Sequence, residues 1–138
     1  MSESSEQQKQ LKIQKGIRQA EDLLVTLIQN ALDNKQSYGE LEESQFRNLV
    51  RVADTTESTE VIKNFLRYQV GRDKKWGRGK DSLAEKIVQD IDNRIKDCAK
   101  KIATDSKTDD VKSIWIELTR RYLGYGARYL TYKLKGES

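Results

Sequence analysis

The feature that constrains the fold most is a repeat of apolar side chains at helical spacing over several long stretches. The two longest run from Ile13 to Ala31 and from Leu83 to Ile102. Apolar residues three and four positions apart form one stripe along an α-helix, and the stripe is buried against neighbouring elements. Proline is absent and 35% of the residues are charged, which is typical of long helices with solvated outer faces. We therefore expect an all-α fold, a compact bundle of about five helices.

The length of 138 residues favours a single domain. We place this helical-bundle domain at residues 10–136, because residues 1–9 are polar, lack periodicity and are expected to form a disordered tail. No stretch approaches the roughly 20 apolar residues of a membrane span, and the N-terminus lacks the apolar core of a secretory signal. The lone Cys98 fits a reducing compartment. These features predict a cytoplasmic protein without a membrane partner.

The residue types that catalysis and metal binding use most are scarce. Histidine is absent and cysteine occurs once. This removes the commonest general base and leaves no Cys/His metal site and no internal disulfide. Neither a Walker-type phosphate loop nor a dinucleotide-binding fingerprint is present. The acidic pairs at 42–43 and 109–110 lie near expected helix starts, where carboxylates stabilise the helix dipole. We therefore expect no catalytic residues, no cofactor and no metal.

Cations gather in one part of the chain, although the net charge of +4 is too small to diagnose a nucleic-acid-binding protein. Residues 63–80 hold seven cations and one anion and end in the glycine-rich segment 71–80. Such a stripe can follow a phosphate backbone, with glycines admitting phosphate oxygens to main-chain amides and the segment's tryptophan stacking on a base. The alternative is a solvated basic surface with that tryptophan folded back onto the bundle. The candidate RNA-binding residues are Arg47, Arg51, Lys63, Arg67, Arg72, Lys74, Lys75, Arg78, Lys80 and Trp76.

The last expected helix, from Val111 to about Lys135, combines aromatic and basic residues. Its tyrosines fall on one arc of the helical wheel that also contains Val111 and Leu118, so we interpret them as a continuation of the core stripe. Gly124 and Gly126 are unusual inside a helix and predict close approach of a neighbouring backbone. The tyrosines on the core arc are Tyr122, Tyr125, Tyr129 and Tyr132.

Three short segments resemble the small subunit of type III CRISPR effector complexes. They are residues 44–49 (SQFRNL), residues 61–68 (VIKNFLRY) and the following pair 71–72 (GR). In that family, a short helix with a Ser/Thr-Gln-Leu/Ile-Arg-like start precedes a helix that ends in a Tyr-x-x-Gly-Arg-like turn. Two longer amphipathic helices follow. The resemblance covers roughly residues 41–135 in order and spacing, and it departs from the family pattern at 120–125 (RRYLGY).

This resemblance implies a specific function. Small subunits of the family are non-catalytic helical bundles that stack head to tail along the guide RNA and its paired target RNA. They contact the RNA backbone without reading its sequence, while other subunits of the complex make the cuts. The partners implied are therefore guide RNA, target RNA, other effector subunits and further copies of the same chain. On this interpretation the phosphate contacts are Arg47, Arg51, Lys63, Arg67 and Arg72.

Other functions remain open on sequence grounds. The main alternative is an all-helical protein–protein adaptor with no nucleic-acid role. A helix-turn-helix DNA reader over the second and third helices is a weaker alternative, because the cations lie on a helix face and a loop more than at a recognition-helix N-terminus.

Overall fold

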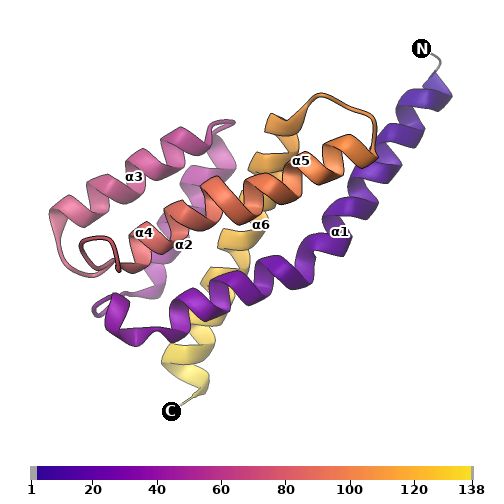
Figure 1. Cartoon of the computed structure of the whole chain (residues 1–138). Helices are drawn as coiled ribbons and strands as arrows, with labels where there is room; N and C mark the ends of the chain where they lie inside the picture. The colour runs from indigo at the N-terminus through magenta and orange to yellow at the C-terminus, as the bar shows by residue number, and fades with distance from the viewer. Residues whose placement is uncertain (1–2, 138) are drawn as a thin grey trace.

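The computed structural model describes residues 3–137, and over that range the protein is built from helices with no strand (Figure 1). Helices α4 and α5 join through the π-helical turn η2 into one continuous helix, which makes five main helices. The predicted all-α bundle of about five helices is confirmed. The elements are α1 (Glu3–Asp33), η1 (Lys35–Ser37), α2 (Glu43–Thr55), α3 (Thr59–Arg72), α4 (Leu83–Asp90), η2 (Ile91–Ile95), α5 (Lys96–Asp105), α6 (Val111–Thr131) and η3 (Tyr132–Gly136).

Helix α6 is the centre of the packing. It contacts α1, α2 and α5, while α3 packs on α2 and α4. In Figure 1, α3, the α4–α5 helix and α1 run alongside one another in front of α2 and α6. Gly126 brings α6 close to two neighbours, because a methyl group there would lie 2.6 Å from Phe46 Cζ and 2.7 Å from Ile28 Cγ1. The atoms close to Gly126 belong to side chains, so the expected approach of a neighbouring backbone is not what this glycine admits, and a methyl group at Gly124 would meet nothing within 4 Å.

The N-terminal segment differs from the expectation. Residues 1–2 lie outside the described residues, but α1 begins at Glu3, so 3–9 are helical instead of forming an irregular tail. Glutamate, glutamine and lysine are good helix formers, and adding turns to an existing helix avoids the cost of nucleation. A Glu6–Lys9 ion pair of 3.7 Å spans one turn of this segment. Helix α1 therefore projects beyond the rest of the bundle (Figure 1).

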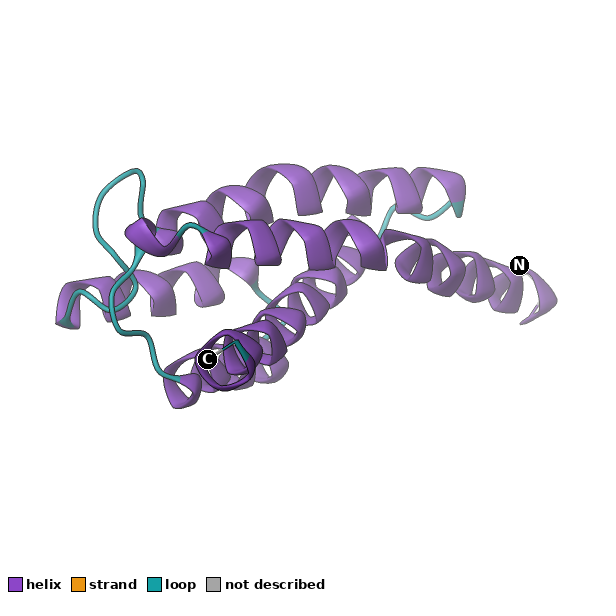
Figure 2. Ribbon diagram, turned by 90° about the horizontal axis from the view of Figure 1, so that it is seen from below, coloured by secondary structure: helices purple, strands orange, loops and turns teal. Residues whose placement is uncertain are grey.

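Two loops meet at the opposite end of the molecule. The longer one, residues 73–82, connects α3 to α4, and it crosses the segment between η1 and α2 (Figure 2). The Gly39 N–H donates to the Lys75 carbonyl across this contact, at 3.1 Å. Gly77 has φ +80° and lies directly against the Ser37 carbonyl, so a side chain would be excluded there on both counts. The loop is therefore anchored on the bundle.

The aromatic arc of α6 is buried at its start and emerges at its end. Tyr122 is fully buried, and its hydroxyl donates to the Asp90 carboxylate at 2.8 Å. Burial and this neighbouring carboxylate raise the pKa of the Tyr122 hydroxyl well above its usual value. Tyr125 and Tyr129 are half-buried against the core, as expected. Tyr132 is 52% exposed, so its assignment to the core is wrong: the arc has passed the last neighbouring helix at that point.

No described helix is both long and apolar enough to cross a bilayer.

Candidate nucleic-acid interface

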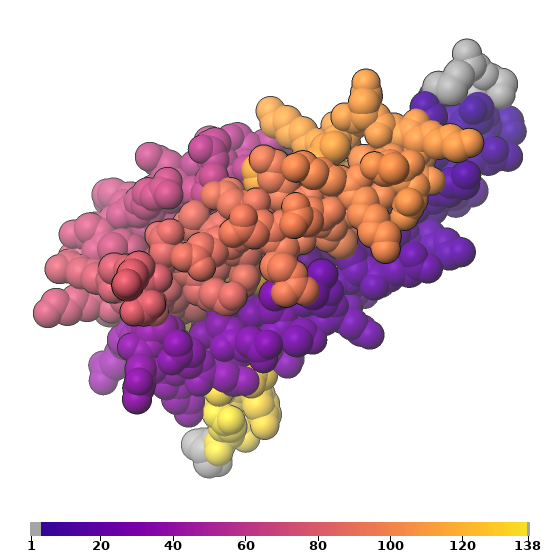
Figure 3. All heavy atoms as spheres, in the orientation of Figure 1, coloured from indigo at the N-terminus to yellow at the C-terminus, as the bar shows by residue number. Residues whose placement is uncertain are grey.

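Half of the candidate RNA-binding residues gather at one end of the molecule, where α3 runs into the loop 73–82. We call this group the basic end. Its members lie on the left in Figures 1 and 3, and all are solvent-exposed. The basic end consists of Arg67, Arg72, Lys74, Arg78 and Lys80.

None of these five cations is neutralised by a carboxylate. The side chains of Arg67, Lys74 and Lys80 make no hydrogen bond or ion pair with any residue in 3–137. The Arg72 guanidinium lies 5.5 Å from the centre of the exposed Tyr68 ring, which orients the cation without cancelling its charge. Arg78 Nε donates to a backbone carbonyl of α3 at 3.3 Å. The basic end therefore presents unpaired positive charge to solvent.

A shallow cavity of about 310 Å³ lies beside the basic end, between α3, the loop and the start of α4. Arg67 lines it together with Gly71, Gly79 and Glu85. Ser82 caps α4 here, because its hydroxyl accepts a hydrogen bond from the Glu85 N–H at 3.1 Å. The glycines leave room for a phosphate group next to Arg67, although the carboxylate of Glu85 limits the positive potential on the α4 side.

Trp76 is not available to stack on a base. The side chain is fully buried, and its ring lies 5.5 Å from that of Phe46, centroid to centroid. The Ala84 N–H donates to the Trp76 carbonyl at 3.1 Å, which fixes the loop against α4. The expected base contact is wrong, and the alternative of a tryptophan folded onto the bundle holds. The physical reason is the large apolar area of an indole, which is stabilised more by the core than by solvent.

Lys63 is also withdrawn from the interface. It lies on the buried side of α3 with 7% of its surface exposed, and its Nζ donates to Asp92 Oδ1 at 2.8 Å while also pairing with Glu60. Burial lowers the pKa of Lys63, but the hydrogen bonds to the two carboxylates outweigh burial and raise the pKa above its usual value. The expectation of a solvated phosphate contact here is wrong, because an acid from the η2 turn neutralises the lysine.

Lys75 is partly neutralised, since its Nζ lies 3.0 Å from Glu42 Oε1. That hydrogen bond raises the pKa of the lysine. Asp73 is engaged as well, because its Oδ1 accepts from the Lys75 N–H at 2.8 Å. Lys75 thus helps to hold the loop on the segment before α2. It adds less unpaired positive charge than the four other cations within residues 72–80.

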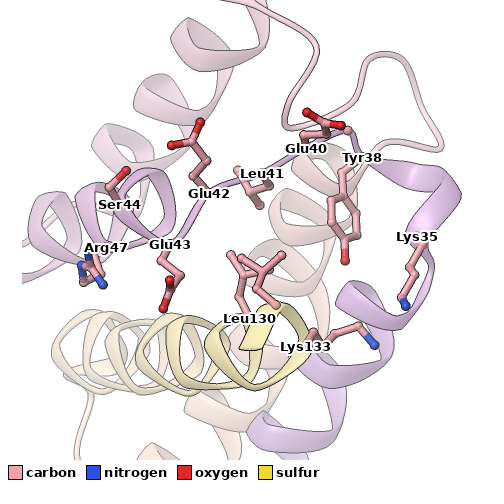
Figure 4. A pocket seen from close by; sticks show the side chains of 12 residues that line it. Lys35, Tyr38, Glu40, Leu41, Glu42, Glu43, Ser44, Arg47, Leu130 and Lys133 are labelled. Carbon is pink, nitrogen blue, oxygen red and sulfur yellow. The ribbon is translucent and has the colours of Figure 1, made fainter. Parts of the chain in front are cut away.

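The two arginines of α2 face a different surface. Arg47 lines a groove of about 740 Å³ between α2, the segment before it, and the end of α6 (Figure 4). Leu130 and Lys133 form the opposite wall. Arg51 lies one turn further along the same face of α2, and its Nη1 donates to Asn48 Oδ1 at 2.8 Å. The structure therefore does not bring these arginines together with the basic end.

A second group of cations was missed by the sequence reasoning. Lys12 and Lys15 of α1 lie beside Lys101 of α5 at the end of the molecule remote from the loop 73–82. The sequence carried a partial signal, since positions 12 and 15 fall on one flank of α1. The proximity of Lys101 depends on tertiary packing alone and has no local signature.

The described residues contain no group of three or more histidine, cysteine, aspartate or glutamate side chains placed to hold a metal ion. What the basic end can do chemically is bind a polyanion through phosphate oxygens, which fixes position without distinguishing bases.

Comparison with known proteins adds no assignment: no family model, no curated protein and no solved structure matches the chain significantly.

Proposed function

We propose that the chain is a non-catalytic small subunit of a type III CRISPR ribonucleoprotein, and that its basic end binds the backbone of the guide RNA–target RNA duplex. The observation that carries the proposal is the set of five exposed cations with no carboxylate partner. The helix order of the bundle is compatible with the family pattern that the sequence resembles. The segment 68–72, which matches the Tyr-x-x-Gly-Arg-like turn, ends α3 at the basic end itself.

The chemistry of the basic end suits backbone binding. The guanidinium groups of Arg67, Arg72 and Arg78 match phosphate oxygens in a bidentate geometry, and the lysines add point charges. Contacts of this kind are independent of base sequence. Several copies of the subunit along one RNA would add their modest affinities through avidity, in a cytoplasmic complex with other effector subunits.

The test uses two variants that each remove three positive charges from exposed positions. The first is Arg67→Gln, Lys74→Gln and Lys80→Gln, in the basic end. The matched control changes three exposed cations elsewhere to glutamine, and the side chain of none of them makes a hydrogen bond or ion pair in the described chain. The control positions are Arg94, Lys100 and Lys112.

Binding to an RNA duplex of mixed sequence is measured by fluorescence anisotropy over a series of salt concentrations. The basic-end variant should lower the slope of log affinity against log salt by about two to three, because each phosphate contact on a duplex contributes about 0.9. The control variant should leave the slope unchanged. Equal losses in both variants, or a loss confined to one base sequence, would contradict the proposal.

A second candidate function, a protein–protein adaptor, is favoured by the groove shown in Figure 4. Its apolar lining includes Tyr38, Leu41 and Leu130, and Leu134 at its edge is 49% exposed. Charged residues of both signs surround this lining, as in many protein-binding grooves. On this alternative, Leu134→Arg abolishes capture of a protein partner while the basic-end variant leaves assembly intact; on the RNA proposal, the basic-end variant abolishes RNA retention.

A further inference from the structure

We propose that the pocket between α1 and α5 is a phosphate-group binding site, separate from the basic end and independent of the proposed RNA function. The pocket has a volume of about 300 Å³. It lies where the exposed half of α1 meets the end of α5, on the right-hand side of Figures 1 and 3. This is the end of the molecule opposite the loop 73–82 (Figure 2).

The pocket concentrates uncompensated positive charge. Lys12 and Lys15 of α1 and Lys101 of α5 line it, and none of the three ammonium groups forms an ion pair or hydrogen bond with a described residue. Asp105 is the one acid in the lining, so the lining residues carry a net charge of +2. Lysines three positions apart on a helix repel each other. A bound anion would relieve this repulsion between Lys12 and Lys15.

A serine hydroxyl also borders the pocket. Ser106 lies at the end of α5 with only 2% of its surface exposed. Its N–H donates to the Ile102 carbonyl at 3.0 Å, but its hydroxyl makes no hydrogen bond in the described chain. Because Ser106 lines the pocket, its hydroxyl is open to a ligand or to water there. The Ser106 hydroxyl and the amide of Gln19, which also lines the pocket, supply neutral donors beside the three ammonium groups.

The walls of the pocket are set by close helix packing. A methyl group at Gly16 would lie 3.0 Å from Ile102 Cγ2, so α1 and α5 are in tight contact at the floor. Burial raises the pKa of the Cys98 thiol against the opposing effect of Lys101, which keeps the thiol neutral and adds no negative charge. The mixture of ammonium groups, a hydroxyl and an amide in a partly open pocket suits a phosphate group whose substituent extends into solvent.

The experiment follows backbone amide shifts of the full chain by two-dimensional ¹⁵N–¹H NMR. Inorganic phosphate and adenosine monophosphate are titrated separately at constant ionic strength, with chloride as the balancing anion. We expect saturable shifts confined to residues 12–19 and 98–106. Linear shifts that do not saturate with either probe, or shifts spread evenly over all lysine-bearing segments, would overturn the proposal.

Matched variants test the lining residues. Lys15→Gln with Lys101→Gln removes two charges from the pocket and should weaken binding at least about tenfold, as expected for two lost charged hydrogen bonds. Lys100→Gln with Lys112→Gln removes the same charge from exposed positions outside the pocket and should leave affinity unchanged. Ser106→Ala, checked for helicity by circular dichroism, should also weaken binding. Equal affinity in both double variants would refute the site.

Two oligonucleotide arms distinguish the sources of the phosphate group. A short RNA with a 5′-phosphate and the same RNA with a 5′-hydroxyl are titrated under the same conditions. Shifts in the pocket with the first RNA alone identify a terminal phosphate, and equal shifts with both identify the phosphodiester backbone. Shifts with adenosine monophosphate but with neither RNA identify a small phosphate ester. Each of these results supports a phosphate site. If none of the four probes shifts the amide signals of the pocket residues, the proposal is refuted.

Discussion

Replacing Trp76 tests whether its side chain stabilises the core or contacts RNA. Trp76 is fully buried against Phe46 in the loop that carries most of the basic end. Truncating a buried tryptophan to alanine removes a large contact area and leaves a cavity, with a cost of about 3–5 kcal/mol. Trp76→Ala should therefore lower the urea midpoint of unfolding by at least about 1 M, for a denaturant slope of about 1–3 kcal/mol/M. Far-UV circular dichroism follows the transition.

Trp76→Phe is the companion variant. The Trp76 Nε1 is buried and has no hydrogen-bond partner in the described chain. Phenylalanine removes this orphaned donor, whose burial costs about 1–3 kcal/mol, and this gain offsets part of the lost ring contact. The variant should thus be clearly more stable than Trp76→Ala and should retain wild-type RNA affinity. A Trp76→Ala protein of wild-type stability that loses RNA binding would refute the reasoning, because it would place the ring against a base.

Three further predictions concern packing, capping and charge. Gly126→Ala should destabilise the protein by about 1–3 kcal/mol in urea unfolding, since the new methyl group overlaps Phe46. Gly124→Ala in the same helix should stabilise the protein by up to about 1 kcal/mol, because the methyl group meets no neighbour there. Equal effects of the two variants on the free energy of unfolding would contradict the packing of α6. Ser82→Ala should cost about 1 kcal/mol through loss of the α4 cap, and an unchanged midpoint would remove that role. The pKa of Lys63 is raised in the folded protein, so its ion pair stabilises the fold. This contribution to the free energy of unfolding is fully present below about pH 10.5, the usual pKa of lysine, and is lost as the pH rises through the pKa in the folded state. Lys63→Met should therefore flatten the alkaline part of the stability profile, and profiles of identical shape would speak against the ion pair.

The features that sequence reasoning predicted correctly depend on local patterns. The apolar stripe from Leu83 to Ile102 predicted the α4–α5 helix, because this pattern spans only neighbouring turns. The start of α1 was placed too late for a related reason. Its first residues lack an apolar stripe, but they extend an existing helix and need no packing of their own.

The site could be predicted only in part, because charge pairing is a tertiary property. Lys63 looks solvated by its place in a run of cations, yet its partner Asp92 follows 29 positions later on another helix. Arg47 and Arg67 are both among the expected phosphate contacts, yet they line different cavities. Trp76 lies among glycines and cations, and its burial depends on packing against Phe46 of α2, which is distant in the sequence. The run of exposed cations at the end of α3 was visible, because it lies within one short segment.

Tagged purification of the protein from its source cell, with sequencing of any co-purifying RNA, tests the central claim most directly. We expect short RNAs that share a repeat-derived end, together with several larger proteins in fixed ratio. Loss of those RNAs from the basic-end variant, with the control variant unaffected, would tie their retention to Arg67, Lys74 and Lys80. Co-purification of a single protein partner without RNA would contradict the account and favour the alternative function of a protein–protein adaptor. A broad mixture of cellular RNA would also contradict it, since the basic end would then bind phosphate outside any guided complex.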